Sequence, residues 1–303
     1  MLLIVRMKYH QNPTAVFNRE FFVSKLVLLV LISIALFFSN FLFGINKAKA
    51  SQAASVSGDF RYSFNSPGTL LETGSMGESS SPYFWVNSGA KLVIGKEGSG
   101  GTVSGKLPIS DPFRVLYSSN NALDTESGYH PQNIFRLLTR SIWGDLEQEL
   151  TFRITNQNLA DSPNREGHNG ILLMSRYSDQ YNLYYAGIRN DGEAIIKKKV
   201  NGSYYTLASV QIFGVKGQYD RTTTPSLLPK MKWMRMKVQV TDQKDGSVKI
   251  RLLLDRENDG SFVSILSAVD QGVGGEPLHK AGYAGIRTDF MDVEFDNYRV
   301  SNY

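Results

Sequence analysis

Polar and apolar residues alternate with a period of two through most of the chain after Ser51, and this pattern restricts the fold to extended strands. In the clearest segment, Leu146, Gln148 and Leu150 fall on one face of a strand, and Glu147 and Glu149 fall on the other. Two further segments, 233–240 and 248–254, show the same alternation. No heptad and no helical period follows Ser51, so the sequence predicts an all-β protein with almost no helix after this point.

Short turn sequences separate the alternating segments. Asn190-Asp191-Gly192 and Asn201-Gly202 bound one expected strand, and Asp245-Gly246 connects two others. Asn-Gly and Asp-Gly favour hairpins because both residues tolerate a positive φ. A succession of short strands joined in this way predicts two antiparallel sheets packed as a sandwich.

Residues 51–303 are predicted to form a single domain, in which the segments without alternation are loops. The part 51–140 is rich in Gly and Ser and is predicted to be loop-rich, with strands only near Asp59–Phe64 and Lys91–Ile94. Asn158–Asn169 and Gln218–Pro229 are also predicted loops, and long loops on a sandwich often carry function. The sequence has no internal repeat.

The first 50 residues have a different composition. Leu26–Ile45 is an uncharged, apolar run that follows Lys25, and Ala48-Lys49-Ala50 is a small-x-small sequence before the polar Ser51. A basic segment, an apolar helix and such a site predict a secretory signal peptide over residues 1–50. The apolar run is also long enough to span a bilayer, so an uncleaved signal anchor is the alternative. Contact with a membrane is expected only in that case.

Charge and cysteine content exclude several classes of protein. Six of the 33 basic residues and one of the 28 acidic residues precede Ser51, which leaves 27 of each sign afterwards. A neutral domain gives no electrostatic argument for binding nucleic acid. The chain has no Cys, and 253 residues are enough to fold without disulfides. The signal pattern and the absence of Cys favour a bacterial source.

Four segments resemble the concanavalin A-like (laminin G-like) jelly rolls of secreted bacterial proteins. They are Gly170–Leu207 (GILLMSRYSDQYNLYYAGIRNDGEAIIKKKVNGSYYTL), Trp233–Val238, Gly282–Arg287 (GYAGIR) and Phe295–Asn297 (FDN). The resemblance extends over 170–300 and implies a jelly-roll sandwich. That fold carries lectins, glycosidases, polysaccharide lyases and structural modules, so the resemblance does not select one activity.

Aromatic and basic residues concentrate in the same segment. Tyrosine rings stack on the apolar faces of sugars, and Arg binds carboxylates through two hydrogen bonds. Tyr184 and Tyr185 are consecutive, so only one of them can face a groove. Alternatively, these residues are ordinary strand-forming tyrosines and a solvated basic face. The residues predicted to bind a glycan are Arg176, Tyr177, Tyr181, Tyr185, Arg189 and Lys197.

Two catalytic sites follow from resemblance to enzymes with this fold. Asp145, Glu147 and Glu149 resemble the E-x-D-x-E strand of retaining β-glucanases, although the order of Asp and Glu differs. The strand around Tyr185 and Arg189 resembles that of alginate lyases, which use Tyr as acid and base. A Q-I-H motif of those lyases is absent, and the nearest cluster contains His130 and Gln132.

Some jelly rolls of this class hold a structural Ca²⁺ near their termini. Asp59 and Asp296 are the candidates by position, and no cofactor is expected to be required. Together the observations predict a monomeric carbohydrate-binding protein, secreted or on the cell surface, with a polysaccharide as its partner. A polysaccharide-degrading enzyme of uronate lyase or retaining glucanase type is the first alternative. A non-catalytic structural or cell-surface interaction protein is the second.

Overall fold

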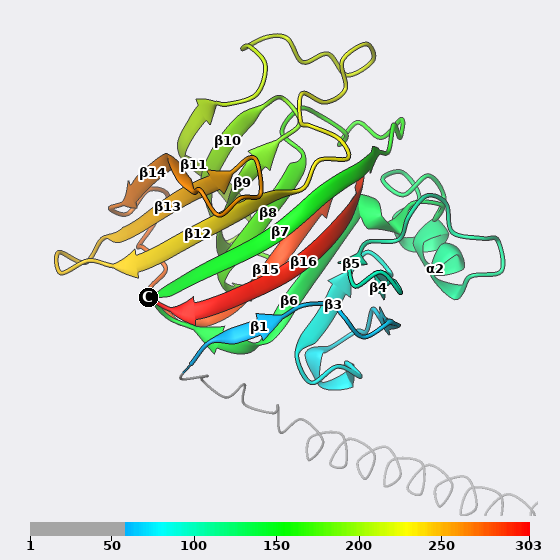
Figure 1. The fold of residues 1–303 in the computed structure, drawn as a ribbon, viewed down its shortest axis with the longest axis horizontal. Coiled ribbons are helices and arrows are strands. Elements are labelled where there is room, and N and C mark those ends of the chain that lie inside the picture. The colour runs from blue at the N-terminus through cyan, green and yellow to red at the C-terminus, as the bar shows by residue number, and fades with distance from the viewer. Residues whose placement is uncertain (1–57) are drawn as a thin grey trace, which may run out of the picture. The chain divides into compact units, whose positions relative to one another are not determined.

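The computed structural model describes residues 58–303, which form two antiparallel sheets packed face to face (Figure 1). The predicted signal segment, residues 1–50, lies outside the described residues. All strand pairs in both sheets are antiparallel, which confirms the all-β sandwich predicted from the alternation.

The first sheet has nine strands, in the order β14-β13-β12-β7-β16-β5-β4-β2, with β1 pairing with β16. Strands far apart in sequence lie side by side, because β7 pairs with both β12 and β16. The strands are β1 (Phe60–Tyr62), β2 (Gly68–Leu71), β4 (Lys91–Ile94), β5 (Gly100–Gly101), β7 (Leu146–Gln157), β12 (Met234–Asp242), β13 (Val248–Asp255), β14 (Val263–Asp270) and β16 (Met291–Asn302).

The second sheet has seven strands, in the order β11-β10-β9-β8-β15-β6-β3. Four consecutive strands, from β8 to β11, form a meander through three hairpins, and β15 then joins β8 to β6. The strands are β3 (Phe84–Ser88), β6 (Ile134–Trp143), β8 (Gly170–Asp179), β9 (Asn182–Arg189), β10 (Glu193–Val200), β11 (Ser203–Gln211) and β15 (Gly282–Asp289).

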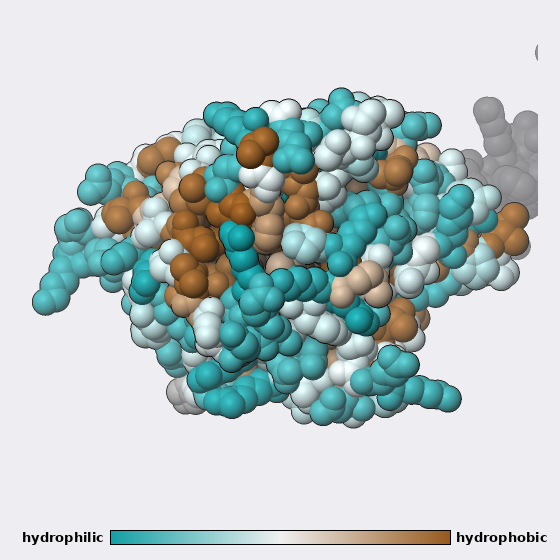
Figure 2. Space-filling view, turned by 45° about the horizontal axis from the view of Figure 1, so that its top comes forward, coloured by the Kyte–Doolittle hydropathy of each residue, from teal (hydrophilic) through white to brown (hydrophobic). Residues whose placement is uncertain are grey.

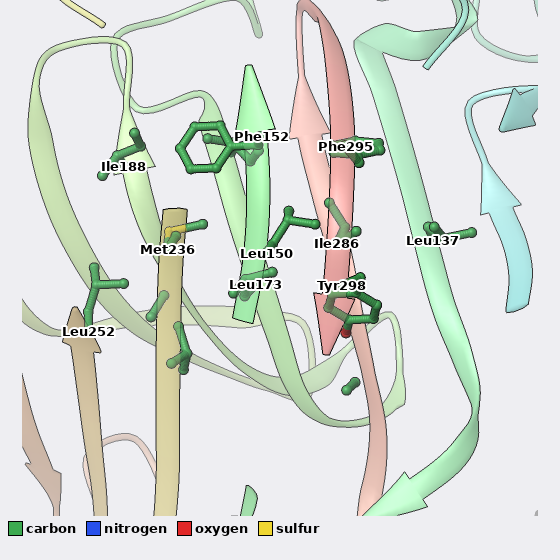
Figure 3. Close-up of a cluster of buried hydrophobic side chains, with 14 of the residues drawn as sticks. Leu137, Leu150, Phe152, Leu173, Ile188, Met236, Leu252, Ile286, Phe295 and Tyr298 are labelled. Atoms are coloured by element: carbon green, nitrogen blue, oxygen red, sulfur yellow. The ribbon is translucent and has the colours of Figure 1, made fainter. Parts of the chain in front are cut away.

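The hydrophobic core fills the space between the sheets. In Figure 3, side chains such as Leu173 and Ile286 from the seven-stranded sheet point toward Leu150 and Phe152 from the nine-stranded sheet. The rings of Phe135 and Phe295 stack across the two sheets with centroids 5.9 Å apart. These residues occupy alternate positions of their strands, so the period of two in the sequence is the signature of this core.

The turns also agree with the sequence. Asn201 and Gly202 both have positive φ, 48° and 85°, as a tight hairpin between β10 and β11 requires. The predicted strands near 59–64 and 91–94 correspond to β1 and β4. The loop-rich part contains more structure than predicted, because it also forms β2, β3, β5, the short helix α2 (Pro112–Asn120) and the 3₁₀ turns η1 (Met76–Glu78) and η2 (Pro131–Asn133). Asp111 caps α2 by accepting a hydrogen bond from the Phe113 amide.

One buried ion pair connects the two sheets where β10 and β14 contact each other. The ammonium of Lys198 lies 2.9 Å from the carboxylate of Asp270, and both side chains are fully buried. The Tyr184 hydroxyl donates to the same carboxylate and accepts from the Leu278 amide. Lys198 also donates to the Gly275 carbonyl, so the cluster attaches the 271–279 loop to the sheets.

Figure 2 shows hydrophilic side chains over most of the face it presents, with the largest group of hydrophobic residues left of the centre and smaller groups elsewhere. No helix within residues 58–303 combines the length and the apolar character needed to cross a membrane.

Candidate functional site

The outer face of the seven-stranded sheet carries a second set of buried apolar side chains, separate from the core. Tyr185 belongs to this set, whereas Tyr184 points into the core, as the alternation predicts. Gly187 follows Tyr185 on the outer face, and a Cβ there would lie 2.1 Å from the Ile171 carbonyl oxygen, so no side chain fits. The outer apolar set is Leu138, Leu172, Met174, Tyr177, Leu183, Tyr185 and Ile195.

Two adjoining hollows, of about 340 and 290 Å³, lie over this apolar face and together form what we call the trough. They are continuous because both are lined by Ile134, Tyr204, Arg287 and Asp289. The other polar residues and tyrosines that line the trough are Asn121, Asp124, Arg136, Asn164, His168, Asn169, Tyr177, Gln180, Tyr181, Tyr185, Arg189, Lys197 and Lys199.

Two tyrosines present exposed rings at the trough. The side chains of Tyr181 and Tyr204 are 52% and 49% exposed, whereas Tyr185 is buried. The Lys199 ammonium lies 4.4 Å from the centroid of the Tyr204 ring and 5.8 Å from that of Tyr181. Tyr185 meets Tyr204 edge to face, with centroids 6.1 Å apart. Exposed rings beside donors are suited to a ligand with both apolar faces and polar edges.

Basic side chains outnumber acidic ones in the trough. Five Lys and Arg residues line it against two Asp residues, Asp124 and Asp289. Both carboxylates are already engaged, since Asp289 pairs with Arg287 at 3.0 Å and Asp124 accepts from Ser162 and Asn164. The local net charge is therefore +3 with His neutral, whereas residues 51–303 as a whole have a formal net charge of zero.

The environment of the trough shifts the pKa values of its lining residues. Desolvation by burial lowers the pKa of Lys197, and the nearby Arg189 lowers it further. Burial alone would raise the pKa of Tyr204, but its contacts with Lys199 and Arg287 outweigh that effect and lower the pKa. Burial raises the pKa of Tyr185. Among these tyrosines, Tyr204 therefore loses a proton more readily than Tyr185.

The structure brings most of the predicted glycan-binding residues together. Tyr177, Tyr181, Tyr185, Arg189 and Lys197 all line the trough. Three of them are less available than the sequence implies, because Arg189 pairs with Asp191 and Glu193 and the side chains of Tyr177 and Tyr185 are buried.

Arg176 corrects the prediction. Its side chain is fully buried and pairs with Asp145 and Asp242, both at 2.7 Å. It also donates to the carbonyl oxygens of Gly144 and Leu278. Its φ of 49° is left-handed, which breaks the strict alternation along β8 and turns the side chain away from the face where the period of two places it. Arg176 is therefore a structural residue.

The glucanase-like carboxylates do not lie in the trough. Glu147 and Glu149 lie at the start of β7, in the other sheet, and Asp145 directly precedes this strand. Glu147 lies 3.1 Å from Lys237, Glu149 pairs with Arg235, and Asp145 pairs with Arg176. A hollow of about 400 Å³ does include Glu149, but its other charged residues are the arginines Arg61, Arg235 and Arg299. Among the described residues Glu149 is the one carboxylate that lines this hollow, and it is paired with Arg235, whereas a retaining glycosidase needs two carboxyl groups.

The four lyase-like residues are also separated. Tyr185 and Arg189 line the trough, but Gln132 is fully buried and donates to Asp292 and to the Gly105 carbonyl. The His130 ring is bound to Glu126 and is only 10% exposed. The histidine that does line the trough is His168, from the 158–169 loop.

The two metal candidates have other partners. The Asp59 carboxylate pairs with Arg61 at 2.9 Å and with Arg299 at 3.2 Å, and Asp296 accepts from the Asn297 side chain. Within 58–303 no three His, Cys, Asp or Glu side chains gather as metal ligands. This arrangement does not favour Ca²⁺ at Asp59, whose charge two guanidinium groups already neutralise.

Several lining residues escaped the sequence analysis. Arg287 directly follows the core residue Ile286, so its outward position follows from the period of two. That Arg287 and Lys197 line the same hollow depends on strand order, which the sequence pattern does not give. Asn164, His168 and Asn169 come from the 158–169 loop, which the sequence marks as long and polar but not as part of a groove.

Comparisons with known proteins give structural matches only. A scan against family models finds no match, and neither does a search of curated proteins. Among solved structures, the carbohydrate-binding module CBM66 from Bacillus subtilis is similar, with a TM-score of 0.44 and 14% identity over 72% of this chain and 95% of that one. A Bacillus subtilis protein with a galectin-like fold has a TM-score of 0.43 and 11% identity over 82% of this chain and 97% of that one.

The β-glucanase of Bacillus licheniformis is also similar, with a TM-score of 0.42 and 11% identity over 82% of this chain and all of that one. These neighbours are jelly-roll proteins of the lectin-like and glucanase-like class that the sequence resembles. Identities this low concern the fold and not the ligand.

Proposed function

We propose that this protein is exported and binds a polysaccharide in the trough without cutting it. One observation carries the proposal: the exposed rings of Tyr181 and Tyr204 border a hollow whose floor is apolar and buried. A sugar ring combines a C–H face with a rim of hydroxyls. The tyrosine rings match the face, and the amide and charged side chains of the trough match the rim.

The export part of the proposal rests on the sequence alone. The apolar run before Ala48-Lys49-Ala50 has the features of a signal that is cleaved after Ala50. Export places the trough outside the cell, on secreted material or at the cell surface, where polysaccharides are accessible.

A glycan array probed with the exported protein tests the binding. We expect one class of polysaccharide to be retained, and we expect Tyr204→Ala and Tyr181→Ala each to weaken that binding by about 5- to 30-fold, as loss of a central aromatic contact does. Tyr303→Ala is the matched control, because Tyr303 is 58% exposed at the C-terminus and outside the trough. Normal folding with no binding to any glycan would contradict the proposal and favour a structural or protein-interaction role.

A second candidate function is polysaccharide cleavage by elimination. Tyr204 is better placed for it than the buried Tyr185, because Tyr204 is half exposed at the trough and its contacts with Lys199 and Arg287 lower its pKa. A Tyr204 phenolate would remove the proton from C5 of a uronate, and the C4–O bond would break as the C4=C5 double bond forms. The leaving oxygen would take a proton from the Tyr204 phenol formed in this step or from water. The unsaturated product absorbs ultraviolet light. Absorbance that rises with uronate polymers, and that Tyr204→Phe abolishes while Tyr185→Phe does not, would establish this function over binding alone.

A further inference from the structure

Three basic residues of the trough form no ion pair within the described residues. Arg287 pairs with Asp289, and Arg189 pairs with Asp191 and Glu193. In contrast, Arg136, Lys197 and Lys199 form no ion pair with any carboxylate in the part of the chain that the structure describes, and these three are called the free cations below. Glu72 and Asp191 act on Arg136 and Lys197, respectively, only at longer range.

The free cations are unusual for this protein. The mature chain has 27 residues of each sign, and most charged side chains on the opposite sheet pair with a neighbour, as Lys237 does with Glu147 and Arg235 with Glu149. Lys197 is also partly shielded from water, lying beside the Tyr204 ring with its ammonium 5.7 Å from the ring centroid. A partly buried cation without an anion loses hydration and gains no ion pair, so an anionic ligand would supply the missing partner.

The positions of the free cations suit an extended polymer. Lys197 and Lys199 are alternate residues of β10, about 6.6 Å apart by twice the strand rise. Arg136 lies on β6, four strands away in the order β10-β9-β8-β15-β6, which is about 19 Å at the usual strand spacing. Together they place positive charge at both sides of the trough, with the paired Arg287 on β15 between them.

We propose that the ligand of the trough is an acidic polysaccharide, whose carboxylate or sulfate groups bind Arg136, Lys197 and Lys199 while its sugar rings lie against Tyr181 and Tyr204. This inference rests on the proposed glycan-binding function and names its substrate class. Lysine ammonium groups act as point charges that accept either anion, so the shared requirement is a negative charge on the sugar.

The experiment measures binding of the full chain to four polymers: polygalacturonate, dextran sulfate, neutral dextran and polyglutamate. We expect polygalacturonate, dextran sulfate or both to bind at least tenfold more tightly than neutral dextran. The advantage should shrink as salt rises, because exposed charge pairs are screened. Polyglutamate, which has the charge but no sugar ring, should bind more weakly than the acidic glycans.

Variants locate the charge. Lys197→Gln and Lys199→Gln should each lower affinity for the acidic polymer by about 3- to 10-fold, as loss of one charged contact does. Both should weaken the binding of neutral dextran less than that of the acidic polymer, because a neutral sugar offers these lysines only hydroxyl groups. Lys249→Gln is the matched control, because Lys249 is an exposed strand lysine on β13 of the other sheet.

The outcomes separate this inference from the proposed function. Binding of neutral glycans equal to or tighter than that of acidic ones would overturn the acidic ligand and leave glycan binding intact. If polyglutamate bound as tightly as the acidic glycans, and Tyr204→Ala changed neither affinity, the acidic-glycan ligand would be overturned, because binding would then depend on charge alone. No binding of any glycan, acidic or neutral, would overturn both.

Discussion

Replacing Asp270 by Asn tests how the buried Lys198 is held in the sandwich. The substitution keeps the size of the side chain but removes the only carboxylate that contacts Lys198 among the described residues, leaving the ammonium with the Gly275 carbonyl at 2.7 Å. Removing one partner of a buried ion pair costs about 3–5 kcal/mol. For a domain of this size, that lowers the melting temperature by about 6–20 °C, since each kcal/mol shifts it by about 2–4 °C.

Urea denaturation followed by tryptophan fluorescence measures the free energy of unfolding of this variant. Lys198→Met/Asp270→Asn should recover much of the loss because neither charge then remains buried. Asp59→Asn is the control, since the exposed pairs of Asp59 with Arg61 and Arg299 are worth about 0–1 kcal/mol. An Asp270→Asn variant within about 0.5 kcal/mol of the wild type would refute the reasoning, because that is the range of an ordinary surface substitution.

The same variant has a pH signature. Burial alone would raise the pKa of Asp270, but hydrogen bonds from Tyr184 and Lys198 outweigh it and lower the pKa in the folded state. The stabilisation is therefore fully present above the ordinary Asp pKa of 3.8 and is lost as pH falls through the lower folded-state pKa. The difference in unfolding free energy between the wild type and Asp270→Asn should shrink over that acidic window.

Three further predictions concern the ligand, a corrected residue and export. Affinity for an acidic glycan should fall as pH rises through the pKa of Lys197, which lies below the ordinary 10.5, because the neutral amine cannot pair with an anion. Calorimetry from pH 7 upward should show this fall, and the fall should be weaker in Lys197→Gln. The nearby titratable or charged groups that remain in that variant are Lys199, Arg189, Arg287, Tyr204 and Asp191. Arg176→Met should destabilise the fold by about 1–3 kcal/mol, because the carbonyl oxygens of Gly144 and Leu278 lose their donor, whereas the partly exposed Asp145 and Asp242 can be solvated by water. It should not change glycan affinity in the folded protein, and a selective loss of affinity would restore Arg176 to the binding site. N-terminal sequencing of the exported protein should begin at Ser51, whereas a start at Met1 or Met7 in a membrane fraction would establish the anchor.

The alternation of residues predicts the sandwich because burial of one strand face imposes a period of two. This period also separates Tyr184 from Tyr185 correctly. It does not predict Lys198, whose position between Lys197 and Lys199 is an inward one that a lysine rarely takes. Only the tertiary fold supplies Asp270 and Tyr184 as its partners, and nothing near Lys198 in sequence signals them.

The trough depends on strand order, which local patterns do not contain. The sequence places Tyr185, Arg189 and Lys197 on one face because β9 and β10 form a hairpin. It cannot add Arg136 and Arg287, whose strands reach this sheet from residues far before and after the hairpin. The prediction for Arg176 is wrong for a different reason. The left-handed backbone at this one residue turns its side chain to the opposite sheet face from the one that strict alternation assigns.

The central claim is that the trough on the seven-stranded sheet binds an acidic glycan. A crystal structure of the protein with a short oligogalacturonate tests it most directly. We expect the sugar in the trough, with carboxylate oxygens about 2.7–2.9 Å from the ammonium groups of Lys197 or Lys199 and a sugar ring against Tyr204. Sugar bound instead on the nine-stranded sheet, at the hollow lined by Arg61, Glu149 and Arg235, would contradict the account.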